Sequence, residues 1–225
     1  MIASGAKQMT SMEAGKFTPA TSGIVLHSPA FYDFIVWLAF FGKEKEFRQK
    51  VLNLAHIRAG EQVLDVGCGT GTLAITAKQH VGPTGKVYGL DASQEMLARA
   101  EKKARKEGVE VAFKAGVVEQ MPFPDAQFDA VLSTVMLHHL PRKARLQCVR
   151  EMRRVAKPGG RILAVDFDGT DQSHGFISRI HRGHGHVGLT DLTMLVNEVG
   201  LEVIESGVVG FRDLNFVLAK TPCCI

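Results

Sequence analysis

Residues 63–74 read VLDVGCGTGTLA, an apolar, strand-like run that passes through a glycine-spaced turn into a helical sequence. Glycine has no Cβ atom, so this turn can bend sharply and let a ligand lie against backbone amides at the positive end of the helix. A dinucleotide fingerprint, G-x-G-x-x-G, would need glycine where the chain has Thr72. The pattern is instead D-x-G-x-G-x-G, beginning at Asp65. It favours a nucleotide ligand without a pyrophosphate.

The composition indicates one domain in a reducing compartment. With 225 residues, of which 45% are apolar and 22% charged, the chain can bury one core and carry a modest cap. Cysteines occur at positions 68, 148, 223 and 224 without the spacing of a disulfide framework, and one lies inside the glycine turn. Residues 1–18 contain no apolar core of signal-peptide length. We therefore expect a cytoplasmic location.

Basic residues gather between positions 142 and 157, although the formal net charge is only +4. In the same segment, apolar residues recur at helical spacing: Leu146, Val149, Met152 and Val155. This stripe would face the core and leave the basic side chains on the solvated outer face. No aromatic residues alternate with these charges to stack on bases. We predict no nucleic-acid partner.

Alternating helical and strand patterns predict an α/β fold. Helices are expected at 43–56, 73–80, 93–108, 142–156 and, with Thr190 as its cap, 190–199. Strands are expected at 63–66, 87–90, 109–114, 128–135, 161–167, 201–209 and 211–219. The last two strands follow each other without a helix, which predicts a hairpin. We therefore expect a Rossmann-like, seven-stranded, mostly parallel sheet with an antiparallel last strand, helices on both faces and an N-terminal helical cap.

Residues 29–41 are almost uniformly apolar and are bounded by a helix start at Ser28-Pro29 and a stop at Gly42. The segment is too short to span a bilayer, and Asp33 interrupts it. We predict no transmembrane segment there. One interpretation is a helix buried against the domain. The other is a wall for an apolar substrate, or a patch that contacts a membrane surface or the second subunit of a homodimer.

Five motifs between residues 50 and 220 resemble those of the class I S-adenosylmethionine (SAM)-dependent methyltransferases. They stand at residues 63–71, 87–93, 121–131, 138–141 and 154–160. The closest resemblance is to the small-molecule branch that includes the ubiquinone/menaquinone biosynthesis C-methyltransferases. It implies SAM as the cofactor and methyl transfer to a small, partly apolar acceptor of quinone, phenol, lipid or thiol type. It also implies a methyltransferase domain over 58–225, preceded by a flexible lead-in and helical cap over 1–57.

The same resemblance implies roles for individual residues. Gly67 and Gly69 would approach the methionine and ribose parts of SAM, and Asp65 would lie near its amino end. Asp91 would bind the ribose hydroxyls, as carboxylates after the second strand do in nucleotide-binding folds. The other expected cofactor-binding residues are Cys68, Gly71, Ala92, Met96, Val117, Val118 and Ser133. Where relatives read Gly-Asp-Ala, this chain reads Gly-Val-Val from position 116, so backbone groups there would replace the acid that contacts adenine.

Methyl transfer from a sulfonium needs an aligned acceptor, and a phenol, enol or carbon acid must also lose a proton. His138 and His139 follow the strand expected at 128–135, at the edge where α/β sheets bind ligands. They are candidate bases, although the pair can equally shape the pocket through backbone contacts. A thiolate or an arsenite-like nucleophile would need no base.

A histidine-rich segment precedes the last expected helix, in the insert where this fold builds its acceptor site. It contains His181, His184 and His186, with His174 upstream. These side chains can abstract a proton or bind the acceptor, ligate zinc or iron, or belong to a solvated loop. We assign them to the catalytic set and predict no resident metal. The alternative functions are a SAM-binding protein without transfer activity and a metal- or metalloid-linked methyltransferase that uses this segment.

Overall fold

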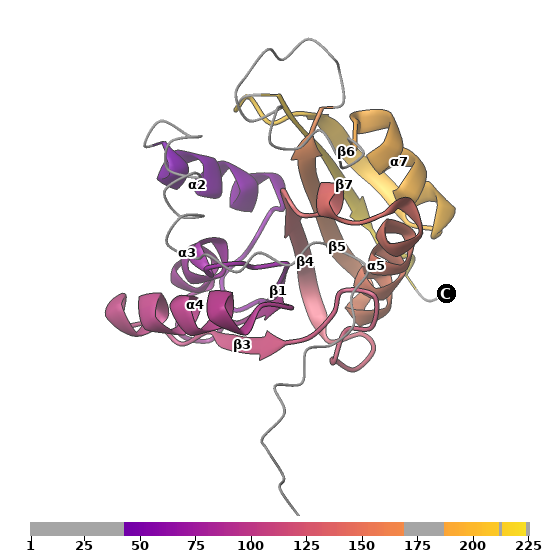
Figure 1. The fold of residues 1–225 in the computed structure, drawn as a ribbon. Helices are drawn as coiled ribbons and strands as arrows, with labels where there is room; N and C mark the ends of the chain where they lie inside the picture. Colours follow the sequence, from indigo (N-terminus) through magenta and orange to yellow (C-terminus); the bar gives the residue numbers. More distant parts are fainter. Residues whose placement is uncertain (1–42, 169–186, 212, 224–225) are drawn as a thin grey trace, which may run out of the picture.

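The computed structural model describes residues 43–168, 187–211 and 213–223 (Figure 1). Its strands are β1 Gln62–Val66, β2 Lys86–Asp91, β3 Ala112–Ala115, β4 Phe128–Thr134, β5 Ala156–Phe167, β6 Glu202–Val208 and β7 Leu214–Lys220. Its helices are α2 Glu44–Leu54, α3 Thr72–Val81, α4 Gln94–Lys106, α5 Arg142–Val155 and α7 Leu189–Glu198, together with the short 3-10 helix η1 Leu137–His139.

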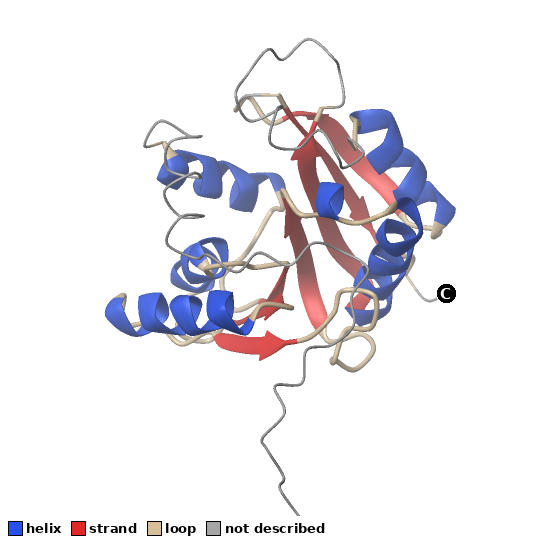
Figure 2. Cartoon of the chain, viewed as in Figure 1, coloured by secondary structure: helices blue, strands red, loops and turns tan. Residues whose placement is uncertain are grey.

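The seven strands form one sheet in the order β3-β2-β1-β4-β5-β7-β6 (Figure 2). Strands β1 to β5 pair in parallel, whereas β7 runs antiparallel to both of its neighbours, β5 and β6. This confirms the expected mostly parallel sheet with an antiparallel last strand. The strand order reverses between β1 and β4. Open α/β sheets bind ligands at such a switch point, outside the carboxyl ends of the strands.

Helices cover both faces of the sheet, as expected from the sequence (Figures 1 and 2). Strand β4 shows why both faces are apolar. Its Ala130 and Leu132 pack in a core with α2 and α3, whereas Val131 between them packs in a second core with α5 and α7. Successive side chains of a strand point to opposite faces, so a strand covered on both sides is apolar throughout.

Three of the element boundaries that differ from the sequence-based expectation have a clear cause in the backbone. Strand β3 starts at Ala112 and not at Val109, because the Val109 N–H donates to the Ala104 carbonyl at 3.1 Å and completes the end of α4. Helix α7 starts one residue before Thr190, the expected cap, because the backbone of Gly188 caps it and accepts from Leu192 N–H at 3.0 Å.

The third boundary is the start of β5. The strand begins at Ala156, whose pairing with Phe128 carries it through the Lys-Pro-Gly-Gly sequence at 157–160, where we expected neither a helix nor a strand. The expected Ser93 cap of α4 is confirmed, because its hydroxyl accepts from Met96 N–H at 3.3 Å. The apolar segment 29–41 and the histidines at 181, 184 and 186 lie outside the described residues, so their interpretations stay predictions.

Candidate functional site

The glycine turn joins β1 to α3 at the switch point of the sheet. Gly67, Gly69 and Gly71 have φ values of 71°, 52° and 74°, in the left-handed region that favours glycine. A Cβ on Gly67 would lie 2.3 Å from Cγ of Met136, and a Cβ on Gly71 would lie 2.6 Å from Cβ of Ala100. The turn is therefore closely packed. Gly71 is required for packing against α4, a role separate from the predicted contact with the cofactor.

Backbone hydrogen bonds fix this turn beside the end of β2. Gly67 and Cys68 both donate N–H to the Leu90 carbonyl, at 2.8 and 2.9 Å. The carboxylate of Asp91 accepts from Gly69 N–H through Oδ2 and from Ser93 N–H through Oδ1, each at 2.8 Å. Burial raises the pKa of Asp91 above its usual value. The backbone donors lower it, but by less than burial raises it. A carboxylate has about four acceptor sites, so the fixed group can still accept a hydrogen bond from a hydroxyl.

Asp65, at the start of this turn, is buried with one carboxyl oxygen that lacks a hydrogen-bond partner among the described residues. That oxygen is Oδ2, and the side chain is 2% exposed. Burial, reinforced by the negative charge of Asp91, raises the pKa of Asp65 to about 7, although a backbone hydrogen bond from Ala74 opposes the shift. A buried carboxyl of this kind fits a cationic donor such as the ammonium group of SAM. The orphaned oxygen and the glycine cradle therefore fit the cofactor that the sequence implies.

Several other predicted cofactor residues line the neighbourhood of Asp91. Met96 is buried in the first turn of α4, and Val118 belongs to the core that also contains Leu90. Val117 is half-buried in the segment that begins where Gly116 N–H donates to the Asp91 carbonyl at 3.1 Å. The Cys68 thiol is buried, and burial raises its pKa well above the usual range, with Asp65 and Asp91 adding to the shift. Cys68 is therefore an unreactive thiol that contributes its backbone.

Ser133 lies apart from this group. It pairs with Val66 across β1 and β4, and paired residues of parallel strands point to the same face of the sheet. Val66 belongs to the core with α5 and α7, whereas Asp65 points to the other face. The Ser133 hydroxyl is fully buried and has no hydrogen-bond partner among the described residues. The structure therefore does not bring it together with Asp65.

One clamp on the glycine turn was not anticipated from the sequence. Lys103 of α4 donates its ammonium to the hydroxyl oxygens of Thr70 and Thr72, at 2.8 and 3.1 Å. Thr70 is buried, so the clamp acts inside the turn and not on its surface. Its only signal in the sequence is that Lys103 stands three residues after Ala100, on the side of α4 that packs against the turn.

The predicted histidine pair lies at the end of β4. His138 is buried, and its Nδ1 lies 2.7 Å from Oδ1 of Asp166, the penultimate residue of β5. The ring of His139 contacts that of His138 at a tilt of 45° with a centroid distance of 3.9 Å, and Phe167 contacts His138 edge-on at 5.5 Å. Val135, just before this segment, has a φ of 53°, which is unusual for a β-branched residue. The chain thus turns sharply to place the histidines at the carboxyl edge of the sheet.

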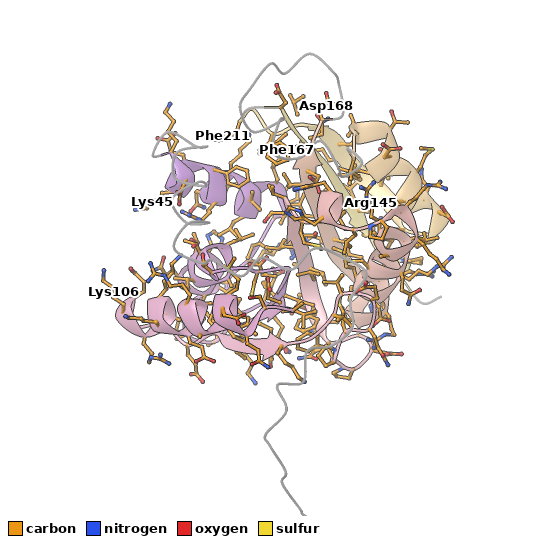
Figure 3. All side chains as sticks on the ribbon, viewed as in Figure 1. Lys45, Lys106, Arg145, Phe167, Asp168 and Phe211 are labelled. Carbon is orange, nitrogen blue, oxygen red and sulfur yellow. The ribbon has the colours of Figure 1, made fainter. Side chains whose placement is uncertain are left out.

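Aromatic side chains extend this edge toward α2. Phe47 of α2 and Phe211, between β6 and β7, make an edge-on contact with ring centroids 5.8 Å apart. Phe167 and Phe211 are partly buried against the same core, which contains Phe47. Figure 3 shows Phe167 and Phe211 near the end of the sheet where β5 finishes. We call Phe47, Phe167 and Phe211 the aromatic rim; aromatic side chains of this kind pack well against flat apolar molecules.

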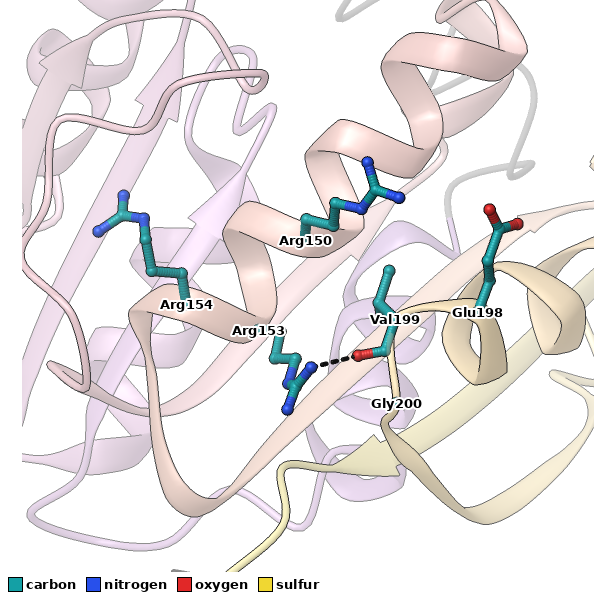
Figure 4. A pocket seen from close by; sticks show the side chains of 6 residues that line it. All are labelled: Arg150, Arg153, Arg154, Glu198, Val199 and Gly200. Carbon is teal, nitrogen blue, oxygen red and sulfur yellow. Dashed lines mark hydrogen bonds between the residues drawn. The ribbon is translucent and has the colours of Figure 1, made fainter.

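A separate groove of about 620 Å³ lies between the C-terminal ends of α5 and α7 (Figure 4). It is lined by Arg150, Arg153, Arg154, Glu198, Val199 and Gly200. Because β5 begins directly after α5, the groove lies at the amino edge of the sheet, opposite the glycine turn. Arg153 donates to the Val199 carbonyl at 2.6 Å, and Arg154 forms ion pairs with Glu151 and Asp125. These arginines hold the two helices and a loop together.

The described residues also bear on metal binding and on membrane crossing. The residues that the structure describes contain no group of three or more His, Cys, Asp or Glu side chains placed to hold a metal ion. Among the same residues, none of the helices has the length and apolar character that crossing a bilayer demands.

Comparisons with known proteins agree with this geometry. Residues 63–160 match a family described as methyltransferase domain. A demethylmenaquinone methyltransferase of Geobacillus kaustophilus is 36% identical over 138 residues, which cover 61% of this chain and 58% of that protein. The ubiquinone/menaquinone biosynthesis C-methyltransferase UbiE of Pseudomonas putida is 36% identical over 146 residues, which cover 64% of this chain and 56% of that protein. The chain thus spans less than two thirds of the length of these relatives.

Solved structures share the fold. A SAM-dependent methyltransferase from Aquifex aeolicus superposes with a TM-score of 0.71 at 24% identity, covering 87% of this chain and 99% of that one. The [4+2]-cyclase SpnF superposes with a TM-score of 0.68 at 20% identity, covering 80% and 81%. At these identities the likeness concerns the fold alone. The family match and the shared fold identify a methyltransferase domain over residues 63–160, and the glycine turn with its orphaned carboxyl oxygen fits SAM as the cofactor.

Proposed function

We propose that this protein transfers the methyl group of SAM to a ring carbon of a hydroquinone-type acceptor. The observation that carries the proposal is the arrangement at one edge of the sheet. There, a cofactor cradle with an orphaned carboxyl oxygen at Asp65 lies beside a buried histidine, His138, and an aromatic rim. The demethylmenaquinone and ubiquinone/menaquinone methyltransferases to which the chain is similar support this acceptor class.

Different residues of the cradle would bind different parts of the cofactor. Asp65 would bind the ammonium group, and Asp91 would accept the ribose hydroxyls with the lone pairs that Gly69 and Ser93 leave unused. Ala92, Met96 and the backbone at Val117 and Val118 would border the adenine. When bound, SAM supplies an electrophilic methyl group on a sulfonium. The turn itself would hold that group at the switch point, where the acceptor can approach in line.

The other residues at this edge would act on the acceptor. Phe47, Phe167 and Phe211 would bind its apolar ring and exclude water, which strengthens nearby electrostatic interactions. His138 or His139 would receive the hydroxyl proton that a hydroquinone must lose before its ring carbon becomes nucleophilic. The histidines at 181, 184 and 186, which lie outside the described residues, stay in the catalytic set that the sequence predicts.

Calorimetry with SAM, S-adenosylhomocysteine and NAD tests the cofactor part of the proposal. We expect both SAM and its product to bind and NAD not to bind. Asp91→Ala should lose about 1–3 kcal/mol of SAM affinity, because it leaves the ribose hydroxyls unpaired and frees the turn. Asp129→Asn is the matched control, because Asp129 is an ion-paired carboxylate at the opposite end of β4. Equal SAM affinity in the two variants would contradict the role of Asp91.

Methyl incorporation from labelled SAM tests the acceptor part. The substrates to compare are a 1,4-naphthohydroquinone, a simple phenol and a thiol, with mass spectrometry to locate the new methyl group. We expect the hydroquinone to be methylated on carbon and in preference to the others. Methylation of the thiol alone would overturn the acceptor class. SAM binding without any methylation would favour a SAM-binding protein without transfer activity.

A further inference from the structure

Asp166 is a buried carboxylate whose described partners are all hydrogen-bond donors. Its side chain is fully buried. Oδ1 lies 2.7 Å from Nδ1 of His138 and accepts from Phe167 N–H at 2.8 Å, and Oδ2 accepts from the backbone N–H of His138 at 3.0 Å. Burying an ionised carboxylate is costly unless hydrogen bonds compensate for the lost water. Here both oxygens are compensated, and two of the three contacts come from the same histidine.

These contacts determine the tautomer of His138. A carboxylate oxygen only accepts hydrogen bonds, so Nδ1 of His138 must carry the hydrogen. In the neutral imidazole the lone pair then stands on Nε2. Because Asp166 also accepts from the backbone of His138, it fixes the ring relative to the main chain of η1. The proton-accepting nitrogen thus has one orientation.

The surroundings place this pair next to the cofactor cradle. Met136, two residues before His138, packs its side chain onto Gly67, and Thr134 of β4 pairs with Val165 of β5. Other charged or titratable groups described around the pair are His139, in contact with His138, and Arg145 of α5, which donates to the Leu137 carbonyl at 2.9 Å. Arg145 interacts electrostatically with Asp166 and with Asp191 of α7. Figure 3 shows Arg145 near the start of α5.

We propose that Asp166 is a positioning residue that prepares His138, through Nε2, as the base of the proposed methyl transfer. This inference rests on the proposed function and selects His138 from the histidine pair. Nε2 takes the acceptor's hydroxyl proton as the ring carbon gains the methyl group, and the electron pair of the broken carbon–sulfur bond stays on sulfur. His138 then returns the proton to the oxygen, while the methylated carbon releases its own proton to solvent. Asp166 stabilises the intervening imidazolium.

The test compares two 1,4-naphthohydroquinones in the full-length protein. One has a protonated hydroxyl at the assay pH, and the other carries an electron-withdrawing group that ionises it. With the protonated acceptor, Asp166→Asn should lower kcat about 100-fold or more, because the amide no longer fixes the tautomer, while KM and the Kd for SAM stay within about twofold. With the ionised acceptor the loss should shrink to a few-fold. A merely structural role would lower kcat equally with both acceptors.

Two further variants keep the test decisive if Asp166→Asn does not fold. His138→Gln retains a donor toward Asp166 but removes the base, so it should show the same dependence on acceptor ionisation. Asp129→Asn removes a carboxylate at the opposite end of β4 and should lower kcat equally little with both acceptors. Equal losses with both acceptors in the His138 variant would overturn the inference and leave the proposed function standing. A wild-type protein that methylates neither acceptor would overturn both.

Discussion

Asp65 should make the binding of SAM depend on pH. The pKa of this buried carboxyl is raised to about 7 in the unliganded protein, first by burial and then by the charge of Asp91. An ammonium group at Oδ2 would favour the carboxylate form, so binding releases a proton wherever Asp65 was protonated beforehand. Affinity should then rise close to tenfold per pH unit below pH 7 and level off above it. Between pH 5.5 and 7.5 the gain is about 25-fold.

The stability of the unliganded protein should change in the opposite direction. A carboxyl whose folded pKa lies above its unfolded value holds its proton longer in the native state, so stability falls as pH rises from about 4 to 7. With a folded pKa of about 7 and an ordinary aspartate pKa of 3.8 in the unfolded chain, the loss approaches about 4 kcal/mol above pH 7. Asp65→Asn keeps the shape of the side chain but removes the charge. At pH 8 the unliganded variant should be more stable than the wild type.

Calorimetry in two buffers of different ionisation enthalpy measures the proton released on binding, and denaturant titrations measure stability across the same pH range. The wild type should release close to one proton at pH 5.5 and much less at pH 8. Asp65→Asn should bind SAM weakly, with a flat pH profile between these limits. A wild-type affinity that does not change with pH, or a variant that keeps the wild-type profile, would refute the reasoning about Asp65.

Two further predictions concern the glycine turn. Gly67→Ala should lower the free energy of unfolding by about 1–3 kcal/mol and weaken SAM binding, because the new Cβ meets Met136 and the backbone is left-handed. Gly82→Ala is the control, because Gly82 has a similar φ of 73° and no atom within 4 Å of the added Cβ. A loss of equal size in the control would show that the clash with Met136 is unimportant. Lys103→Met should weaken SAM binding about tenfold in calorimetry by releasing the threonine clamp. The exposed neighbour Lys102, changed to Met, is its control, and equal affinities would count against the clamp.

Helices and strands could be predicted from the sequence where neighbouring residues alone determine them. Buried strands such as β4 are apolar along their whole length, and Ser93 marks the start of α4 by a side-chain cap. The boundaries that differed depend on backbone bonds that any residue can make. Val109 is held by the Ala104 carbonyl, and α7 is capped by the backbone of Gly188. Such bonds leave no trace in side-chain composition.

In the candidate site, too, residues in local motifs could be predicted, whereas contacts between distant residues could not. Asp65 and Asp91 were predicted because each stands in a short motif at a strand end. Asp166 was missed because its partner His138 stands 28 residues earlier, and only the pairing of β4 with β5 brings them together. Lys103 was missed for a similar reason, since it reaches the threonines of the turn across 31 and 33 positions. A single sequence gives no sign of such contacts, which arise from the sheet order.

Asp65 and Asp166 are both buried at the carboxyl edge of one sheet, and their surroundings separate their roles. Both oxygens of Asp166 accept hydrogen bonds within the protein, so these bonds compensate its burial without a ligand and hold it against His138. Asp65 lacks a partner at Oδ2 among the described residues, and its raised pKa shows that its charge is not yet compensated. A carboxylate of the first kind prepares another residue, whereas one of the second kind needs a cation from outside. The same reasoning therefore assigns the binding of the cofactor to Asp65 and the positioning of the base, His138, to Asp166.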